Sequence, residues 1–256
     1  MRDVGVPIDL VAGCSFGALV GAYWCARGDD GVERLLRRAG PLRRAVFQSF
    51  VSSRAVQRFV DDDLHGARLE ELEVPVFPVA TDVATGTQRP IKAGPVGRGV
   101  RASGAFPLTF SPVTSTGYRL VDGGIINNVP EDVLVQEGAD LVVASNVVSQ
   151  PSPMPQVPQP ALPGPWGRFL HELNPLGRLD DMVRSTLILM HSAGSRDAHL
   201  ADVTFNAAPS EAPPWDFHRG RDIIREAEPG VAETLPRILA AWERLARPAA
   251  LRQEAP

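Results

Sequence analysis

Short apolar runs alternate with amphipathic stretches along most of the chain. The apolar runs that predict buried strands are Ile8–Val11, Val76–Ala80, Tyr118–Val121 and Leu141–Ala144. Helical spacing of three and four residues follows the first run through positions 18–26, and a second helix is predicted between Pro130 and Gly138. Strands that alternate with helices predict an α/β fold, a three-layer, mostly parallel doubly wound sheet with helices on both faces.

Further periodic stretches complete the predicted elements. Helices are expected at Val32–Ala39, Arg54–Val60, Arg98–Ser103, Leu179–Ser192, Arg219–Ala227 and Val231–Ala246, and strands at Gln88–Ile91 and Asp202–Asn206. The proline-dense residues 150–165 predict a loop, and residues 248–256 predict a disordered tail. A length of 256 residues suits one large domain, so residues 1–247 are expected to fold as a single unit.

The first predicted strand runs directly into Gly13–Gly17, which reads GCSFG, and then into a helix. This is the G-x-S-x-G pattern in the strand–turn–helix setting of a nucleophile elbow. The turn holds Ser15 at a strained backbone position, and glycines at 13 and 17 are expected to let strand and helix come close. The helix N-terminus then favours negative charge developing near the serine hydroxyl. The alternative is an ordinary tight turn between a strand and a helix.

Asp122 is the leading candidate for the base that would activate Ser15. It follows the strand Tyr118–Val121, and the carboxyl ends of strands gather at one edge of a doubly wound sheet. An aspartate near its ordinary pKa of ~3.9 accepts protons poorly at neutral pH, and burial beneath Gly123 and Gly124 would raise that pKa. Taken alone, Asp122-Gly123 would be read as a turn at the end of a strand.

Histidine is the conventional base in such sites, and the chain has His65, His171, His191, His199 and His218. His218 is the best of the five because an α/β-hydrolase triad runs Ser, Asp, His in chain order. A Ser-Asp-His esterase that uses His218 therefore stays open as an alternative.

Composition and charge narrow the classes of function. The net charge is −4, so nucleic acid is not expected as a partner. Cys14 and Cys25 are expected to be small buried residues rather than a disulfide or metal site. Asp61–Asp63 places three carboxylates side by side, which cannot all turn to one metal ion, and a solvated helix end is expected there.

Four segments together resemble the patatin-like phospholipases. The segments Gly13–Gly17 and Asp122–Gly124 resemble the nucleophile and D-G-G blocks of that family. Ala102–Phe110 resembles its A-S-x-x-x-P-x-x-F block, and Ala80–Gly86 its A-T-D-x-x-T-G segment. The likeness covers about residues 5–148, with the blocks in the family's order. The residues Trp215-Asp216-Phe217 and the helix after them look more like the neuropathy-target-esterase-like branch, here in a bacterial form.

The resemblance implies a serine acyl hydrolase that cleaves phospholipid or lysophospholipid esters through an acyl-serine intermediate. It carries Ser15 over as nucleophile and Asp122 as base, without histidine, cofactor or metal. Backbone support for the reacting groups would come from Gly13, Phe16, Gly17, Gly123 and Gly124. The expected partner is a lipid ester.

One departure from the family concerns its oxyanion hole, a glycine-rich loop some thirty residues before the serine. The fourteen residues before Ser15 contain no such loop, and the first strand of the family's sheet is expected to be absent with it. Three explanations for the missing loop stay open. The start is misassigned or the chain is a fragment, the chain is an inactive member of the family, or another segment or subunit replaces the loop. An upstream domain or partner chain would then cover the exposed sheet edge. Translation of the DNA upstream of Met1 separates the first two explanations. The absence of the loop also motivates a rival function, a non-catalytic interaction or regulatory module.

Nothing in the sequence predicts export or membrane insertion, because no apolar run approaches ~20 residues. A cytoplasmic protein is expected, with peripheral contact at the inner membrane face as an alternative. The segment Met154–Leu170, with Trp166 and Phe169, is the candidate for that contact, and a loop packed on the domain is the simpler interpretation.

Overall fold

The computed structural model describes residues 1, 4–49, 54–107, 109–147, 181–182, 184–190, 192, 200–206 and 217–246. The α-helices are α1 (Phe16–Arg27), α2 (Asp29–Arg37), α3 (Ala39–Ser49), α4 (Ala55–Asp63), α5 (Val96–Ser103), α6 (Glu131–Gln136) and α9 (Gly220–Ala246). The strands are β1 (Val11–Cys14), β2 (Val76–Asp82), β3 (Thr87–Pro90), β4 (Val113–Ser115), β5 (Tyr118–Asp122), β6 (Val143–Asn146) and β7 (Val203–Asn206). Residues 150–165 and 248–256 lie outside the described residues.

Strand β2 is the centre of the main sheet, and every one of its residues is buried. It pairs in parallel with β1 and antiparallel with both β3 and β5, while β4 pairs antiparallel with β5. The predicted α/β class is confirmed. The sheet is mixed rather than mostly parallel, because two hairpins, β2–β3 and β4–β5, supply three of its strands by direct turns rather than helical crossovers.

The strands β1 and β5 follow one another along the same edge of β2. Pro75 O accepts a hydrogen bond from Val11 N of β1, whereas Pro78 O accepts one from Ile91 N at the end of β3. These two carbonyls lie three residues apart, so they face opposite edges of the strand. Since β3 and β5 both pair with residues 80–82, they also occupy opposite edges, which leaves β5 on the edge of β1.

This shared edge brings the ends of β1 and β5 together. The register pairs Cys14 with Val79 and Asp122 with Ala80, the next residue along β2. The two strands run toward each other, so their carboxyl ends meet head-on in the middle of the sheet edge. The predicted meeting of the two ends is confirmed, but it does not arise from parallel strands ending side by side at a rim.

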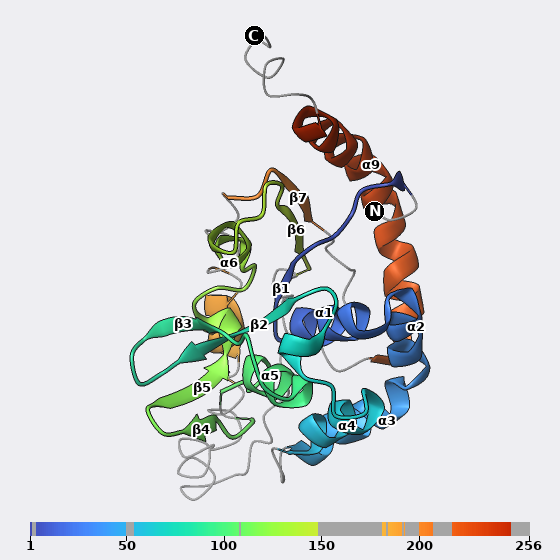
Figure 1. Cartoon of the computed structure of the whole chain (residues 1–256). Helices are drawn as coiled ribbons and strands as arrows, with labels where there is room; N and C mark the ends of the chain where they lie inside the picture. The colour runs from blue at the N-terminus through green and yellow to red at the C-terminus, as the bar shows by residue number, and fades with distance from the viewer. Residues whose placement is uncertain are drawn as a thin grey trace, which may run out of the picture.

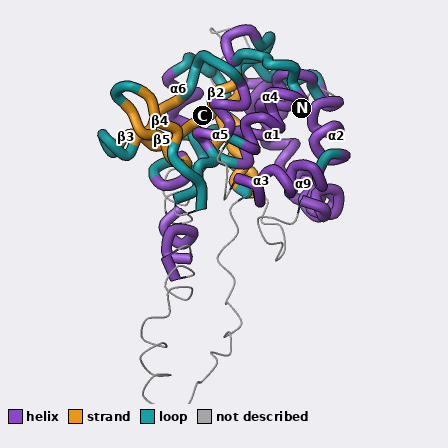
Figure 2. Tube along the Cα trace, turned by 90° about the horizontal axis from the view of Figure 1, so that it is seen from below, coloured by secondary structure: helices purple, strands orange, loops and turns teal. Residues whose placement is uncertain are grey.

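Helices cover both faces of the sheet, and alternate side chains of β2 pack against the helices on opposite faces. Val76 packs with Leu19 and Val100, on the face covered by α1 and α5, while Phe77 packs with Val133 of α6 on the other face. Figures 1 and 2 show β3, β4 and β5 on one side of α5, and α1, α2 and α9 on the other. The largest cluster of buried apolar side chains among the described residues lies on the α1–α5 side of the sheet.

The strands β6 and β7 form a separate parallel pair, with Val143 opposite Val203. Ile238 and Ala241 of α9 pack on this pair together with Met1. Both strands were predicted, the first from its apolar run, and both are confirmed with a shift of at most two residues at each end. The expectation of one domain over residues 1–247 stays a prediction.

Other predicted elements differ from the structure in identifiable ways. The first strand begins at Val11 rather than Ile8, because pairing with β2 begins at Val11 opposite Val76, with a hydrogen bond from Val11 N to Pro75 O just before β2. The two predicted C-terminal helices form one helix, α9, in which Pro229 and Pro236 are both exposed, so water can satisfy the carbonyls that they leave unpaired. Helix α3 and strand β4 were not predicted.

Candidate active site

Ser15 stands between β1 and α1 in a strained backbone conformation. Its φ is 53° and its ψ is −116°, an unusual combination for a residue other than glycine. The helix begins at the next residue, so the free amides of its first turn lie beside the serine. The strand–turn–helix geometry predicted for the GCSFG segment is confirmed.

Only one of the two flanking glycines is required by space. A Cβ at Gly13 would lie 2.6 Å from the carbonyl carbon of Gly17 and 2.7 Å from the amide nitrogen of Ala18. A Cβ at Gly17 would meet nothing within 4 Å. Gly13 therefore permits the close approach of strand and helix, and the expectation that Gly17 does so as well is wrong, because Gly17 faces open space at the start of α1.

This difference gives a matched pair of variants. Gly13→Ala is expected to lower the free energy of unfolding by about 1–3 kcal/mol, since backbone atoms of α1 must move to admit the methyl group. Gly17→Ala is expected to leave stability unchanged or raise it by up to about 1 kcal/mol, because alanine favours helix. Urea unfolding followed by circular dichroism measures both, and equal effects of the two variants would contradict the assignment.

Asp122 ends β5 with its side chain 1% exposed. Its Oδ1 accepts hydrogen bonds from Gly124 N at 2.9 Å and from the Cys14 thiol at 3.4 Å. Among the described residues, Oδ2 accepts no hydrogen bond of regular geometry. The carboxylate is thus held through one oxygen, and the other is left for a reacting group.

Burial raises the pKa of Asp122 above its ordinary value. The Gly124 amide, the Ser15 hydroxyl and the Cys14 thiol oppose this shift without reversing it. The hydroxyl of Ser15 is therefore close enough to interact with the carboxylate, although the contact is not a well-aligned hydrogen bond. Catalytic hydrogen bonds in unliganded enzymes are commonly long or poorly aligned.

Of the two glycines after Asp122, only Gly123 is required by contact with the backbone of another strand. A Cβ at Gly123 would lie 2.3 Å from Val79 O and 3.1 Å from the Cys14 sulfur. A Cβ at Gly124 would lie 2.4 Å from Cε of Met190. The turn therefore passes directly over the end of β1, as expected from its glycines, and Met190 covers it from the other side.

Ser103, at the end of α5, holds the serine turn in place. Its hydroxyl accepts a hydrogen bond from Ser15 N at 2.9 Å and donates one to Val79 O at 2.6 Å. It is completely buried, and a Cβ at the following Gly104 would come within 3.8 Å of the Ser15 hydroxyl. Sequence reasoning placed Ser103 in a family block but gave it no role, because the partner that it positions is 88 residues away.

The amide of Phe16 is the first donor of α1 and lies next to Ser15. Its ring is 48% exposed and stacks on Phe217 with 5.7 Å between centroids. The helical residues 184–190, which contribute Met190, also expose Leu187, Ile188 and Leu189. Apolar side chains are therefore exposed beside the serine and on the segment that covers the turn of Asp122.

The candidate histidines do not join the serine site by any described hydrogen bond. His218 is exposed, and its Cε1 lies 3.9 Å from a Cβ built at Gly40 of α3. His65 is exposed in the turn after α4 with a φ of 55°. His171, His191 and His199 lie outside the described residues, as do Trp215 and Asp216. The alternative that uses His218 stays a prediction.

The three consecutive aspartates do not form a solvated helix end, so that expectation is wrong. Asp63 is fully buried, where it accepts hydrogen bonds from Tyr23, Arg34 and Arg38. Asp61 accepts a hydrogen bond from Gly97 N at the start of α5. Asp61 and Asp63 therefore contact different elements of the fold. No cluster of three or more potential metal ligands occurs within the described ranges. The helices described there also include none that is both long and apolar enough to cross a membrane.

Comparison with known proteins places this chain in a family. The family model of patatin-like phospholipases matches residues 1–135 of the chain. Neuropathy target esterase sws of Drosophila melanogaster is 28% identical over 165 residues, which cover 59% of this chain and 11% of that protein. The patatin-like phospholipase domain-containing protein ZK370.4 of Caenorhabditis elegans is 32% identical over 192 residues, or 69% of this chain and 14% of that protein.

The patatin-like phospholipase domain-containing protein 6 of Homo sapiens is 32% identical over 170 residues, which cover 59% of this chain and 12% of that protein. The chain thus spans no more than 14% of the length of these three relatives. The similarity to a neuropathy target esterase agrees with the predicted branch. These relatives are animal proteins, so a bacterial form stays a prediction.

Proposed function

Because the chain belongs to the patatin-like phospholipase family, we propose that it hydrolyses acyl esters of phospholipids or lysophospholipids, with Ser15 as nucleophile and Asp122 as base. One observation carries the proposal. Cys14, which directly precedes the strained Ser15, and the buried Asp122 pair with adjacent residues of β2, Val79 and Ala80, where the ends of two strands meet. Neither a tight turn nor a strand-end aspartate by itself requires that meeting.

The chemistry follows from the positions of the two side chains. Ser15 Oγ attacks the ester carbonyl carbon while its proton passes to Asp122, whose raised pKa makes it a better acceptor than an exposed aspartate. The carbonyl oxygen gains negative charge, which the Phe16 amide and the N-terminus of α1 stabilise. The alcohol leaves with the proton from Asp122, and an acyl-Ser15 ester remains.

The second half of the reaction uses the same groups. Asp122, again ionised, takes a proton from a water molecule that attacks the acyl-Ser15 carbonyl. The fatty acid leaves and Ser15 recovers its proton. The exposed ring of Phe16 and the exposed apolar residues of 184–190 support a lipid substrate and peripheral contact with a lipid surface, because they offer apolar area near the reacting atoms.

A fluorophosphonate probe tests the nucleophile directly. We expect the probe to label the wild-type chain at Ser15, as located by mass spectrometry of its peptides, and Ser15→Ala to abolish that labelling. Ser115→Ala is the matched control, because it removes an exposed serine hydroxyl of β4 that takes no part in the site, and it is expected to leave the labelling unchanged. Labelling of the Ser15→Ala chain at the wild-type rate would remove Ser15 from the mechanism.

A further inference from the structure

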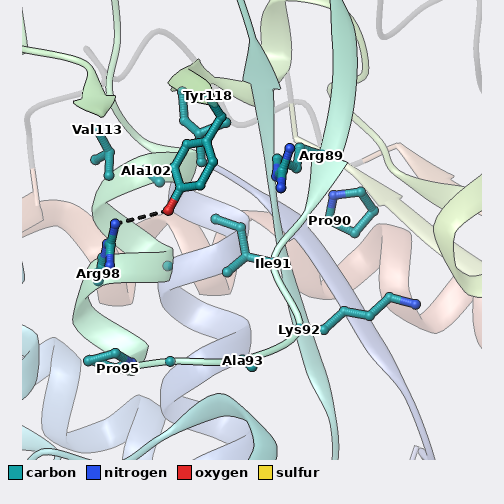
Figure 3. A pocket seen from close by; sticks show the side chains of 13 residues that line it. Arg89, Pro90, Ile91, Lys92, Ala93, Pro95, Arg98, Ala102, Val113 and Tyr118 are labelled. Carbon is teal, nitrogen blue, oxygen red and sulfur yellow. Dashed lines mark hydrogen bonds between the residues drawn. The ribbon is translucent and has the colours of Figure 1, made fainter. Parts of the chain in front are cut away.

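A cavity lies between α5 and the hairpins of β3, β4 and β5 (Figure 3). Its volume is about 230 Å³, smaller than the ~300–1,000 Å³ typical of sites for drug-sized ligands. Ser15, Ser103 and Asp122 are not among the residues that line it. A ligand in this cavity is therefore distinct from an ester bound at Ser15.

Two arginines are gathered on one tyrosine at this cavity. Arg98 of α5 donates a hydrogen bond to the Tyr118 hydroxyl at 2.9 Å, and the guanidinium carbon of Arg89 lies 4.7 Å from the centroid of the Tyr118 ring. Figure 3 shows the guanidinium of Arg98 directed at that hydroxyl. Tyr118 of β5 thus contacts two positively charged groups, one from α5 and one from β3.

The charges at the cavity are not balanced by its own lining. The lining residues include Arg89, Lys92 and Arg98 and no aspartate or glutamate. Lys92 pairs with Glu137 at 2.5 Å, and its ammonium points away from Arg98 in Figure 3. The two arginines are therefore the cations that remain for a ligand.

Of the two arginines, only Arg89 has a carboxylate within ion-pair distance among the described residues. The nearest ion-pair contact of Arg89 is with Asp82 at 3.8 Å, and Asp82 already accepts hydrogen bonds from the amides of Ala84 and Arg119. Arg98 makes no ion pair within the described part of the chain. Arg101 is the next arginine along α5 and lies close to the same positive charges. Its pKa is lowered by burial and, in addition, by the charges of Arg54 and Arg98.

We propose that this cavity binds a phosphate group between Arg89 and Arg98. A guanidinium presents two parallel N–H groups that match the oxygens of a phosphate, and the small volume suits such a group rather than a large ligand. The phosphate belongs either to a soluble molecule or to the headgroup of a membrane lipid. Hydrolysis at Ser15 is not required for this binding, so the two proposals can fail separately.

Calorimetric titration of inorganic phosphate into the full chain at constant ionic strength tests the first source. Arg98→Gln and Arg89→Gln are each expected to weaken binding about ten- to a hundredfold, because each removes a charge-assisted hydrogen bond. Arg119→Gln is the matched control, since it removes the same charge from the neighbouring β5 residue, whose side chain points to the opposite face of the strand. It is expected to change the affinity by no more than about twofold.

Sedimentation with phosphatidylcholine vesicles, with and without phosphatidic acid, tests the second source. Arg98-dependent retention that requires phosphatidic acid assigns the phosphate to a lipid headgroup, and Arg98-dependent binding of inorganic phosphate assigns it to a soluble molecule. Binding of acetate as tight as that of phosphate would overturn the proposal. So would equal losses in the Arg98 and Arg119 variants, or no response to phosphate in either assay.

Discussion

Asp122→Asn is expected to lower the turnover of a lysophospholipid ester by about 10³-fold. A general base contributes about 10²–10⁴-fold to such a reaction, and asparagine cannot accept the proton of Ser15. The substitution keeps an oxygen that can accept from Gly124 N, so the turn is expected to stay in place. Release of fatty acid by the wild-type and variant chains, each at saturating substrate, measures the effect.

Stability separates this loss of activity from misfolding. Burial raises the pKa of Asp122 in the folded chain above its unfolded value of ~3.9, so above that pH the ionised carboxylate favours unfolding. Removal of this charge is expected to leave the free energy of unfolding at neutral pH equal to that of the wild type or higher. A variant that is inactive and less stable would point to a structural role instead.

The raised pKa of Asp122 also determines the direction in which kcat/KM changes with pH. Because Asp122 acts in its ionised form, kcat/KM is expected to fall as the pH drops through its raised pKa, which lies above the usual range of an exposed aspartate. Turnover by Asp122→Asn within tenfold of wild type would move the base elsewhere. His218→Ala is the companion variant, because only a triad that includes His218 loses activity with it.

The turn at Ser15, the proposed nucleophile, could be predicted from the sequence because the elements on either side of it are local. The strand, Gly13 and the helix that present Ser15 lie within 17 consecutive residues, Val11–Arg27. The position of Asp122 was predicted correctly from a rule for parallel strands, but the structure reaches it by another route. Strand β5 enters antiparallel and occupies the edge of β2 just where β1 ends, which depends on pairings that no local pattern encodes.

The residues that sequence reasoning missed are those with distant partners. Ser103 acts on a residue 88 positions away, and Asp63 accepts from Tyr23, 40 positions away. A run of three aspartates at a helix end is usually solvated, and only the packing of α1 and α2 against α4 shows that the third one is enclosed. Buried polar groups are thus the least predictable part of this chain, because a carboxylate's environment is set by elements that fold over it.

The pH dependence of stability provides one test of the buried Asp63. Burial raises its pKa, but the Arg34 guanidinium, the Tyr23 hydroxyl and the charge of Arg38 outweigh that effect and hold the pKa below its ordinary value. The ionised carboxylate therefore stabilises the fold above its unfolded pKa of ~3.9. This contribution is expected to be lost as the pH falls through the lowered folded value.

Asp63→Ala is expected to lower the free energy of unfolding at neutral pH by about 3 kcal/mol. The change leaves the fully buried Tyr23 hydroxyl without its acceptor and separates two guanidiniums from their shared carboxylate. The arginine side chains are 40% and 37% exposed, so water recovers part of their solvation and keeps the loss near the lower end of the range for broken buried pairs. Guanidinium chloride unfolding followed by circular dichroism measures the change.

Asp62→Ala is the matched control for Asp63→Ala, because it removes the adjacent, exposed carboxylate of the same helix. It is expected to change the free energy of unfolding by no more than about 0.5 kcal/mol. Tyr23→Phe, which removes one donor and keeps both ion pairs, is expected to cost about 1 kcal/mol. The loss of unfolding free energy is therefore expected to decrease in the order Asp63→Ala, Tyr23→Phe, Asp62→Ala, as burial and the number of partners decrease. A loss in Asp63→Ala as small as that in Asp62→Ala would show that the buried carboxylate does not hold α1, α2 and α4 together.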